Sequence, residues 1–183
     1  MPNYRRARVQ GGTYFFTVVT HKRKPLFSDG SARLCLREAI SSVHINYPFK
    51  IDAFCLLPDH LHTIWALPEG DENFSKRWRA IKSHFSRRFR EQVNRYAAPT
   101  GSRQVRGELT FWQRRFWEHL IRDENDFRRH LDYIHFNLVK HGYSESVSDW
   151  PWSTFHRYVN EGVYSDDWGG IAMEKIDLNS VGE

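Results

Sequence analysis

The chain predicts an α+β domain with the ferredoxin-like, split βαβ arrangement: an antiparallel sheet with helices on one face. Segments rich in β-branched and aromatic residues alternate with longer segments of helical periodicity, in the order β-α-β-β-α-β-α. The first six elements match the split βαβ pattern, and the seventh is a C-terminal helix that carries a tyrosine. The length of 183 residues suits one domain, which we place at 1–159, with an acidic tail at 160–183.

The first half of the chain predicts one strand, one helix and then two adjacent strands. The strands are rich in β-branched and aromatic residues, and the helix carries apolar residues at roughly helical spacing behind Ser31 as N-cap. The tight connection at Pro58-Asp59 joins the last two strands, and so short a connection implies an antiparallel pair. In order, the four elements span residues 12–20, 31–46, 49–57 and 61–67.

The second half predicts two helices with a strand between them. The first helix has a stripe of Phe, Trp and Ile side chains at spacings of three and four, and the second ends before Gly142 as a C-cap. The stretch Trp-Pro-Trp-Ser-Thr-Phe at 150–155 is expected to dock on the fold through its rings. In order, the elements are a helix at 74–95, a loop at 97–107, a strand at 111–121 and a helix at 126–140.

Composition narrows the class of protein. The formal charge of +5 and the isoelectric point of about 9.3 suggest a polyanionic partner. No apolar run approaches the roughly 18 residues of a membrane span, and the N-terminus lacks the apolar segment of a signal peptide, so we expect a cytoplasmic protein. Cys35 and Cys55 lie in apolar stretches and are expected to be packed thiols, too few for a Cys-rich zinc module.

Two histidines lie one residue apart in the third predicted strand. Residues i and i+2 of a strand share a face, so His60 and His62 present their imidazoles side by side. Two neutral imidazoles held in this way are half of a divalent-metal site. The alternative is a plain pair of strand histidines on a polar sheet face. Asp59, just before the pair, is expected first of all as a turn residue.

A second cluster of polar groups lies on the last predicted long helix. Tyr133 and Asn137 are four residues apart and therefore share a helix face. Tyr133 offers a phenol that can act as a nucleophile, and Asn137 offers an amide oxygen that can be a third metal ligand. If this helix packs near the histidine strand, a metal there could orient a phosphoryl group for attack by the phenol. The alternatives are a core tyrosine and a surface amide.

These motifs together resemble a known family. The His-Leu-His strand, and the helix that reads Tyr-Ile-His-Phe-Asn-Leu-Val-Lys-His-Gly from residue 133, are similar to the HUH single-tyrosine transposases, and most of all to the REP-associated tyrosine transposases. The similarity extends to the start at 4–6, the strand entry at 11–15 and the segment at 150–158. Asn at 137 departs from the Gln usual in related insertion-sequence transposases but is expected in the REP-associated branch. That branch commonly has Pro where Leu138 stands.

The resemblance implies an HUH endonuclease core with His60, His62 and Asn137 as ligands of Mg²⁺ or Mn²⁺, although imidazoles would also suit Zn²⁺. It implies Tyr133 as the nucleophile that forms a 5′-phosphotyrosine link and frees a 3′-OH. The implied partner is single-stranded DNA with REP-type palindromic hairpins. A bacterial, nucleoid-associated location and a monomer are expected. Two other functions remain as alternatives: a catalytically idle nucleic-acid-binding module, and a metal-dependent hydrolase that uses water.

Basic side chains are concentrated on the helix at 74–95. A run of charge is usually a solvated face, but eight cations against one acid exceed what solubility requires, which favours phosphate contacts. Exposed aromatic residues such as Trp112 or Trp117 could stack on unpaired bases, or could pack in the core. The acidic tail could compete with DNA for the basic surface. The predicted DNA-binding residues are Arg5, Arg6, Arg8, Lys76, Arg77, Arg79, Lys82, Arg87, Arg88 and Arg90.

Overall fold

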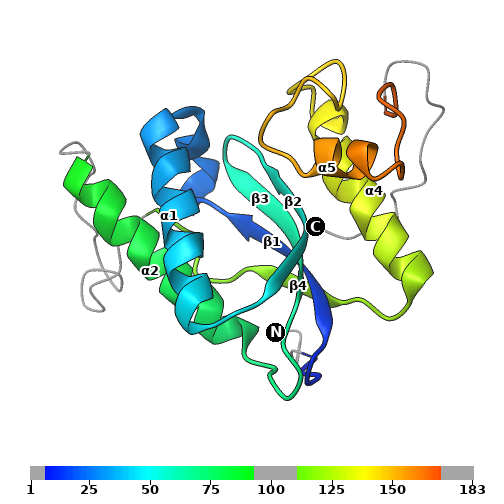
Figure 1. Ribbon diagram of the computed structural model, residues 1–183. Coiled ribbons are helices and arrows are strands. Elements are labelled where there is room, and N and C mark those ends of the chain that lie inside the picture. The colour runs from blue at the N-terminus through cyan, green and yellow to red at the C-terminus, as the bar shows by residue number, and fades with distance from the viewer. Residues whose placement is uncertain (1–6, 93–110, 170–183) are drawn as a thin grey trace.

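A four-stranded antiparallel sheet lies between two groups of helices (Figure 1). The computed structural model describes residues 7–92 and 111–169. The strand order is β2-β3-β1-β4, and every neighbouring pair is antiparallel, which confirms the predicted split βαβ fold. The strands are β1 (Thr13–Val19), β2 (Lys50–Leu56), β3 (His60–Ala66) and β4 (Trp117–Leu120).

The helices divide between the two faces of the sheet. Helices α1 and α2 cover one face, as predicted, whereas α4 and α5 lie on the opposite face (Figure 1). The tyrosine-bearing helix α4 therefore lies on the face of the sheet opposite to α1 and α2. The helices are α1 (Gly30–Asn46), α2 (Phe74–Gln92), α4 (Glu124–Lys140) and α5 (Phe155–Asn160), with short 3-10 turns η1 (His21–Arg23) and η2 (Leu26–Ser28).

Strand alternation sends successive side chains to the two different cores. Phe16 packs with α1 and α2, while its neighbour Phe15 packs with α4. In β3, Trp65 belongs to the core under α1 and α2, where its ring stacks on an α2 tryptophan at 4.2 Å. Because the side chains of a strand alternate, His60 and His62 must point to the other face, toward α4.

Several element boundaries differ from the predicted ones for local reasons. Helix α1 is capped by Asp29, which accepts a hydrogen bond from the backbone N–H of Ser31, so Ser31 is inside the helix rather than its N-cap. The strand predicted at 111–121 is only Trp117–Leu120. Trp112 is buried among aromatic rings of the core, so it does not offer the exposed stacking surface considered above. The predicted loop at 97–107 lies outside the described residues.

The segment after α4 docks on the outer edge of β2, as predicted from its aromatic residues. The N–H of Leu56 donates to the carbonyl of Trp152 at 2.9 Å, and the N–H of Thr154 donates to the carbonyl of Phe54 at 2.8 Å. The indole N–H of Trp150 donates to the carbonyl of Leu56 at 2.9 Å. The segment therefore extends the sheet by a short fifth strand-like stretch.

The chain continues to pack on α4 beyond α5. The hydroxyl of Tyr164 donates to the carboxyl of Asp132 at 2.6 Å, and the ring of Trp168 lies 4.3 Å from that of Tyr164. Residues 170–183 lie outside the described residues, so the division of the chain at residue 159 stays a prediction.

Both cysteines behave as packed thiols. Cys35 and Cys55 are buried and free, which confirms the prediction. Burial raises the pKa of the Cys55 thiol to about 12, so this thiol is protonated and unreactive at neutral pH. Within the described residues, no helix is long and apolar enough to cross a membrane.

Candidate active site

The two histidines of β3 form the centre of the candidate site. His60 follows the tight turn from β2, where the N–H of Leu57 donates to the His60 carbonyl at 2.9 Å. His60 and His62 are almost completely buried, and their ring centroids are 4.9 Å apart. The imidazoles thus lie side by side on the α4 face, as the alternation of the strand predicts.

A hydrogen-bond partner orients each imidazole from behind. Nδ1 of His60 lies 2.6 Å from the carboxylate of Asp59, and Nδ1 of His62 lies 2.9 Å from the hydroxyl of Thr17. A carboxylate only accepts, so Nδ1 of His60 carries the hydrogen and Nε2 carries the lone pair. The same tautomer lets His62 donate to Thr17. Metal-binding histidines typically donate the N–H of the far nitrogen to an acceptor, most often a carboxylate, a backbone carbonyl or water.

Helix α4 brings Tyr133 and Asn137 to the same place. The ring centroid of Tyr133 lies 5.2 Å from that of His62, and both Tyr133 and Asn137 are fully buried. The Nζ atom of Lys140, seven residues after Tyr133 and so on the same helix face, lies 5.7 Å from the centroid of the tyrosine ring. The structure therefore gathers the two imidazoles, the amide and the phenol that sequence reasoning expected to converge.

Three atoms of this group that could coordinate a metal have no hydrogen-bond partner in the described parts of the chain. They are the Nε2 atoms of His60 and His62 and the side-chain oxygen of Asn137, all of which are buried. Buried polar atoms without a partner are rare in folded proteins, and each calls for an explanation such as an ion. Two imidazole nitrogens and one amide oxygen suit a divalent cation. The residues present therefore fit a metal site.

The electrostatics of the site favour the form of histidine that binds metal. Burial, followed by the charges of the neighbouring His60 and His141, lowers the pKa of His62 well below its ordinary value, while the Asn137 side chain acts in the opposite direction. His62 is therefore a neutral imidazole at pH 7. Burial alone would raise the pKa of Asp59, but hydrogen bonds from His60 and Arg23 lower it overall, so Asp59 is a carboxylate.

The other two histidines near the end of α4 have different roles. His135 points away from the site: its Nε2 lies 3.0 Å from the hydroxyl of Thr154, and its ring packs against Phe155. Burial lowers the pKa of His135 to about 3, so it is a neutral core residue. His141 is the exposed C-cap of α4, with its ring centroid 6.2 Å from that of His60.

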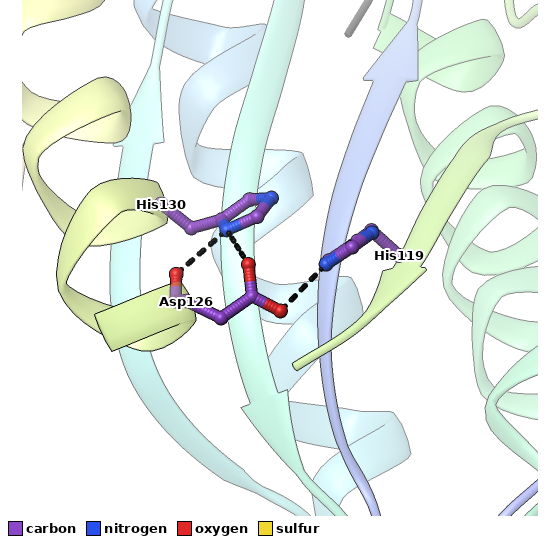
Figure 2. A group of neighbouring side chains, drawn as sticks. All are labelled: His119, Asp126 and His130. Atoms are coloured by element: carbon purple, nitrogen blue, oxygen red, sulfur yellow. Dashed lines mark hydrogen bonds and ion pairs between the residues drawn. The ribbon is translucent and has the colours of Figure 1, made fainter. Parts of the chain in front are cut away.

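A second histidine cluster, not singled out from the sequence, joins β4 to the first turn of α4 (Figure 2). Nε2 of His119 lies 2.8 Å from one carboxylate oxygen of Asp126, and Nδ1 of His130 lies 3.1 Å from the other. These three residues each offer a ligand atom within 4.8 Å of the others, which makes them a second candidate for a metal. The i, i+4 spacing of Asp126 and His130 is a signal that the sequence does contain.

The geometry of this second cluster fits a hydrogen-bonded clamp better than a metal site. The rings of His119 and His130 are stacked, with centroids 4.5 Å apart and planes 17° from parallel. Lone pairs in two nearly parallel planes do not converge on one point. Nδ1 of His130 also lies 2.8 Å from the carbonyl of Asp126, so it carries a hydrogen. Burial alone would raise the pKa of Asp126, but hydrogen bonds from His119 and the backbone of Arg122 lower it overall.

One predicted DNA-binding residue is a structural residue instead. Arg77 is only 2% exposed, and its guanidinium donates to the carbonyls of Tyr47, Pro48 and Asn73. It also pairs with the carboxylate of Asp71 at 2.8 Å. These four hydrogen bonds hold the buried guanidinium inside the protein, so the prediction that Arg77 contacts DNA is wrong.

The other predicted DNA-binding residues on α2 reach the surface. Helix α2 lies on the opposite side of the sheet from the histidine pair (Figure 1), so DNA held there would be remote from the candidate site. Arg88 pairs with Glu38, and Nζ of Lys82 donates to the carbonyl of Gln113 at 2.9 Å. Arg8 is exposed, whereas Arg5 and Arg6 lie outside the described residues. The exposed or half-buried cations of α2 are Lys76, Arg79, Lys82, Arg87, Arg88 and Arg90.

Known proteins share this sequence and this fold. Residues 8–137 match the family described as "Transposase IS200 like". A REP-associated tyrosine transposase of Escherichia coli K12 is 45% identical over 170 residues, which cover 93% of this chain and 92% of the relative. A Haemophilus influenzae relative assigned to the same group is 46% identical over 177 residues, covering 96% and 98%.

A solved structure of a REP-associated tyrosine transposase bound to a REP hairpin is also similar. It is 44% identical, has a TM-score of 0.77, and the match covers 100% of this chain and 98% of that one. The sheet with paired histidines facing a tyrosine helix is thus the fold of a DNA-cleaving and rejoining tyrosine transposase. The chain belongs to the IS200-like transposase family, in its REP-associated tyrosine transposase branch.

Proposed function

We propose that the chain is a metal-dependent, single-stranded DNA endonuclease and strand transferase that cleaves at REP-type hairpins through a 5′-phosphotyrosine. One observation carries this proposal: three buried potential metal-ligand atoms, on His60, His62 and Asn137, have no hydrogen-bond partner in the described residues, and the ring centroid of Tyr133 lies 5.2 Å from that of His62. The similarity to a transposase bound to a REP hairpin supports the choice of DNA.

The proposed metal ligands are His60, His62 and Asn137, with Mg²⁺ or Mn²⁺ as the ion. A mixed nitrogen and oxygen set, completed by water and phosphate oxygens, suits these ions. When bound, the ion would supply Lewis-acid polarisation of the scissile phosphate. Asp59 fixes the tautomer that leaves Nε2 of His60 free for coordination, and Thr17 holds the ring of His62 so that its Nε2 is also free of a hydrogen bond.

Tyr133 is the proposed nucleophile. Its phenolic oxygen loses its proton and forms a bond to phosphorus, the bond from phosphorus to the 3′ oxygen breaks, and that oxygen takes up a proton to leave as a 3′-OH. The new phosphodiester keeps the free energy of the old one, so a later attack by a 3′-OH rejoins DNA without ATP. The Nζ atom of Lys140 lies 5.7 Å from the centroid of this ring, which places a cation beside the proposed nucleophile. Because Tyr133 is fully buried, the phosphate must displace covering groups to reach it.

A suicide-cleavage assay tests this proposal. The protein is incubated with a labelled single-stranded REP hairpin and Mn²⁺ or Mg²⁺, and the products are separated on denaturing gels. We expect a metal-dependent covalent adduct that is absent in Tyr133→Phe and in the His60→Ala/His62→Ala double variant. Tyr158→Phe is the matched control, because this hydroxyl bonds the carbonyl of Asp52, outside the site.

Two outcomes would contradict the proposal. Cleavage without an adduct would make water the nucleophile and the protein a hydrolase. Binding without cleavage or adduct, across metals and hairpins, would leave a DNA-binding module that keeps the appearance of the site.

We also propose that exposed cations of α2, with Arg8 and the N-terminal Arg5 and Arg6, bind phosphates of the DNA. Replacing Arg79 by Ala should lower the slope of log affinity against log salt by about one, as expected for one lost phosphate contact. Arg77→Ala is the contrasting variant: it should lower the stability of the fold because it removes internal hydrogen bonds. An unchanged salt slope in Arg79→Ala would remove this residue from the DNA surface.

The proposed setting is the cytoplasm of a bacterium, in contact with nucleoid DNA, with the chain acting as a monomer. The relatives named above are bacterial proteins, and their DNA substrate would be in that compartment. Light scattering of the purified chain during size-exclusion chromatography would measure its mass directly. A dimer mass would overturn the monomer assignment.

A further inference from the structure

Four aromatic side chains form a continuous row that leads away from the histidine pair. We call His141, Tyr143, Trp150 and Trp152 the aromatic row. The ring of His141 lies 6.2 Å from that of His60, and the next centroid distances along the row are 6.3, 6.4 and 5.2 Å. The row therefore connects the candidate metal site to the surface of the molecule.

Much of this aromatic row is open to solvent. Tyr143 is 41% exposed and Trp152 is 38% exposed, and both are among the large hydrophobic side chains that the described fold leaves uncovered. Single exposed hydrophobic residues are ordinary, but a connected group beside a functional site marks a binding surface.

Hydrogen bonds to the sheet and to α4 hold the backbone of the row in place before any ligand arrives. The carbonyl of Trp152 accepts the N–H of Leu56 at the edge of β2, and the indole N–H of Trp150 donates to the carbonyl of the same leucine. The N–H of Tyr143 donates to the carbonyl of Leu138 at 2.9 Å, at the end of α4. The sheet and helix that carry the histidines and the tyrosine therefore also fix the row, and such preorganisation lowers the cost of binding.

Cations flank the row. The guanidinium of Arg33 lies 4.1 Å over the ring of Trp152. Lys22 and Arg23, both exposed, have φ angles of 57° and 49°, in the left-handed region that non-glycine residues rarely adopt. Such strained backbone clusters at functional sites. Arg23 also lies 3.2 Å from the carboxylate of Asp59, which places this basic turn beside the histidine pair.

We infer that the aromatic row binds the unpaired nucleotides next to the scissile phosphodiester, with bases stacked on Tyr143 and Trp152 and phosphates near Lys22 and Arg23. Aromatic faces combined with cations are what a single strand requires, because every base has a π face and every linkage a negative charge. Continuity with the histidine site favours the substrate strand over a protein partner as the occupant. The inference rests on the proposed function for the identity of the strand.

Binding measurements with two oligonucleotides test the inference. One is a labelled REP hairpin with a few unpaired nucleotides on its flanks, and the other is the same molecule with abasic sites in those flanks. In a Tyr133→Phe background, which prevents cleavage, we expect Tyr143→Ala and Trp152→Ala each to weaken binding of the first by about 5- to 100-fold. Binding of the abasic molecule should change little, because there is no base to stack.

Two variants control for loss of fold and for loss of apolar surface. Tyr143→Phe keeps the aromatic face and should bind as the parent does. Ile45→Ala removes an 80% exposed apolar side chain from α1, outside the row, and should have no effect. An equal loss of binding on intact and abasic flanks, or no loss on either, would overturn the inference.

The inference and the proposed function can fail separately. If the chain with Tyr133 forms the adduct but the row variants bind the intact flank normally, only the row is refuted. If no adduct forms and the base-dependent loss is still seen, the row stands without the chemistry. If Tyr143→Ala instead converts a dimer to a monomer in light scattering, the row is an interface between copies and the inference is overturned.

Discussion

Two histidine clusters lie on the same face of the sheet and differ in what their polar atoms contact. His60 and His62 have Nε2 atoms without a hydrogen-bond partner in the described residues. His119 and His130 instead share the carboxylate of Asp126, which engages a nitrogen of each ring. By residue type the second cluster resembles a metal site at least as closely, since it includes a carboxylate. The comparison teaches that a candidate metal site is better recognised by donor atoms left unsatisfied than by the number of ligand-type residues.

The largest expected effect comes from removing the unsatisfied histidines. The His60→Ala/His62→Ala variant should lose the rise in melting temperature that Mn²⁺ gives the parent protein, because an ion that binds only the folded state stabilises it by about 2.7 kcal/mol at one hundred times its Kd. Differential scanning fluorimetry with and without Mn²⁺ measures this. Asp126→Asn is the control and should keep the response. If only Asp126→Asn lost the rise in melting temperature with Mn²⁺, the metal site would have to be assigned to the second cluster.

A smaller effect is expected from the group that orients His62. Thr17→Val keeps the shape of the side chain but removes the hydroxyl that holds Nδ1 of His62. Loss of such a partner typically weakens metal affinity by about 10- to 100-fold. Titration calorimetry with Mn²⁺ measures the change. Thr63→Val is the matched control on β3, because its hydroxyl bonds the carbonyl of Ala53, and it should leave metal affinity unaltered.

The clamp formed by His119, Asp126 and His130 should contribute to the stability of the fold and not to metal binding. Asp126→Asn should lower the free energy of unfolding at pH 7 by about 2 kcal/mol, because it weakens charge-assisted hydrogen bonds to His119 and His130. The folded pKa of Asp126 is depressed, so its contribution is present above the unfolded value of about 3.9 and is lost as pH falls through the folded pKa. Urea denaturation at pH 7 and pH 3 should show the difference from the parent shrinking in acid. A difference of the same size at both pH values would contradict an ionised carboxylate.

The smallest effect concerns His135, a buried histidine that belongs to neither cluster. His135 has a folded pKa of about 3, below the unfolded value of about 6.5, so between these values only the unfolded chain binds the proton. The contribution of His135 to the free energy of unfolding is therefore fully present above pH 6.5 and falls as the pH decreases. Between pH 6 and pH 5 the parent should lose about 1 kcal/mol more than His135→Gln in urea denaturation. Parallel pH profiles would mean that His135 is not held neutral by burial.

The sequence predicted the candidate site because its residues form two pairs, each at a short spacing within one strand or one helix. The i, i+2 rule placed His60 and His62 on one face, and the i, i+4 rule placed Tyr133 and Asn137 together. The clamp of His119, Asp126 and His130 was not predicted. His119 contacts Asp126 only because β4 pairs with β1 in a particular register, and this register follows from the assembled sheet. The side of the sheet that α4 covers likewise depends on the tertiary packing of both cores.

The error at Arg77 has a different origin, because the sequence contained the signal. Arg77 is three residues after Phe74 and four before Ile81, so it lies on the apolar stripe of α2 rather than on its solvent face. Charge alone suggested a DNA contact, whereas position indicated burial. The carbonyls of Tyr47 and Pro48, in the turn between α1 and β2, accept hydrogen bonds from the guanidinium there.

The docking of residues 152–154 on β2 also governs how copies of the chain can meet. An edge strand with open N–H and C=O groups is a template for sheet extension between molecules and hence for aggregation. Here the groups of Phe54 and Leu56 are already bonded to Thr154 and Trp152. Thr154→Pro, which removes the N–H bonded to Phe54, should free this edge and raise light scattering with protein concentration. We therefore expect the docked segment to protect this edge of the sheet against self-association.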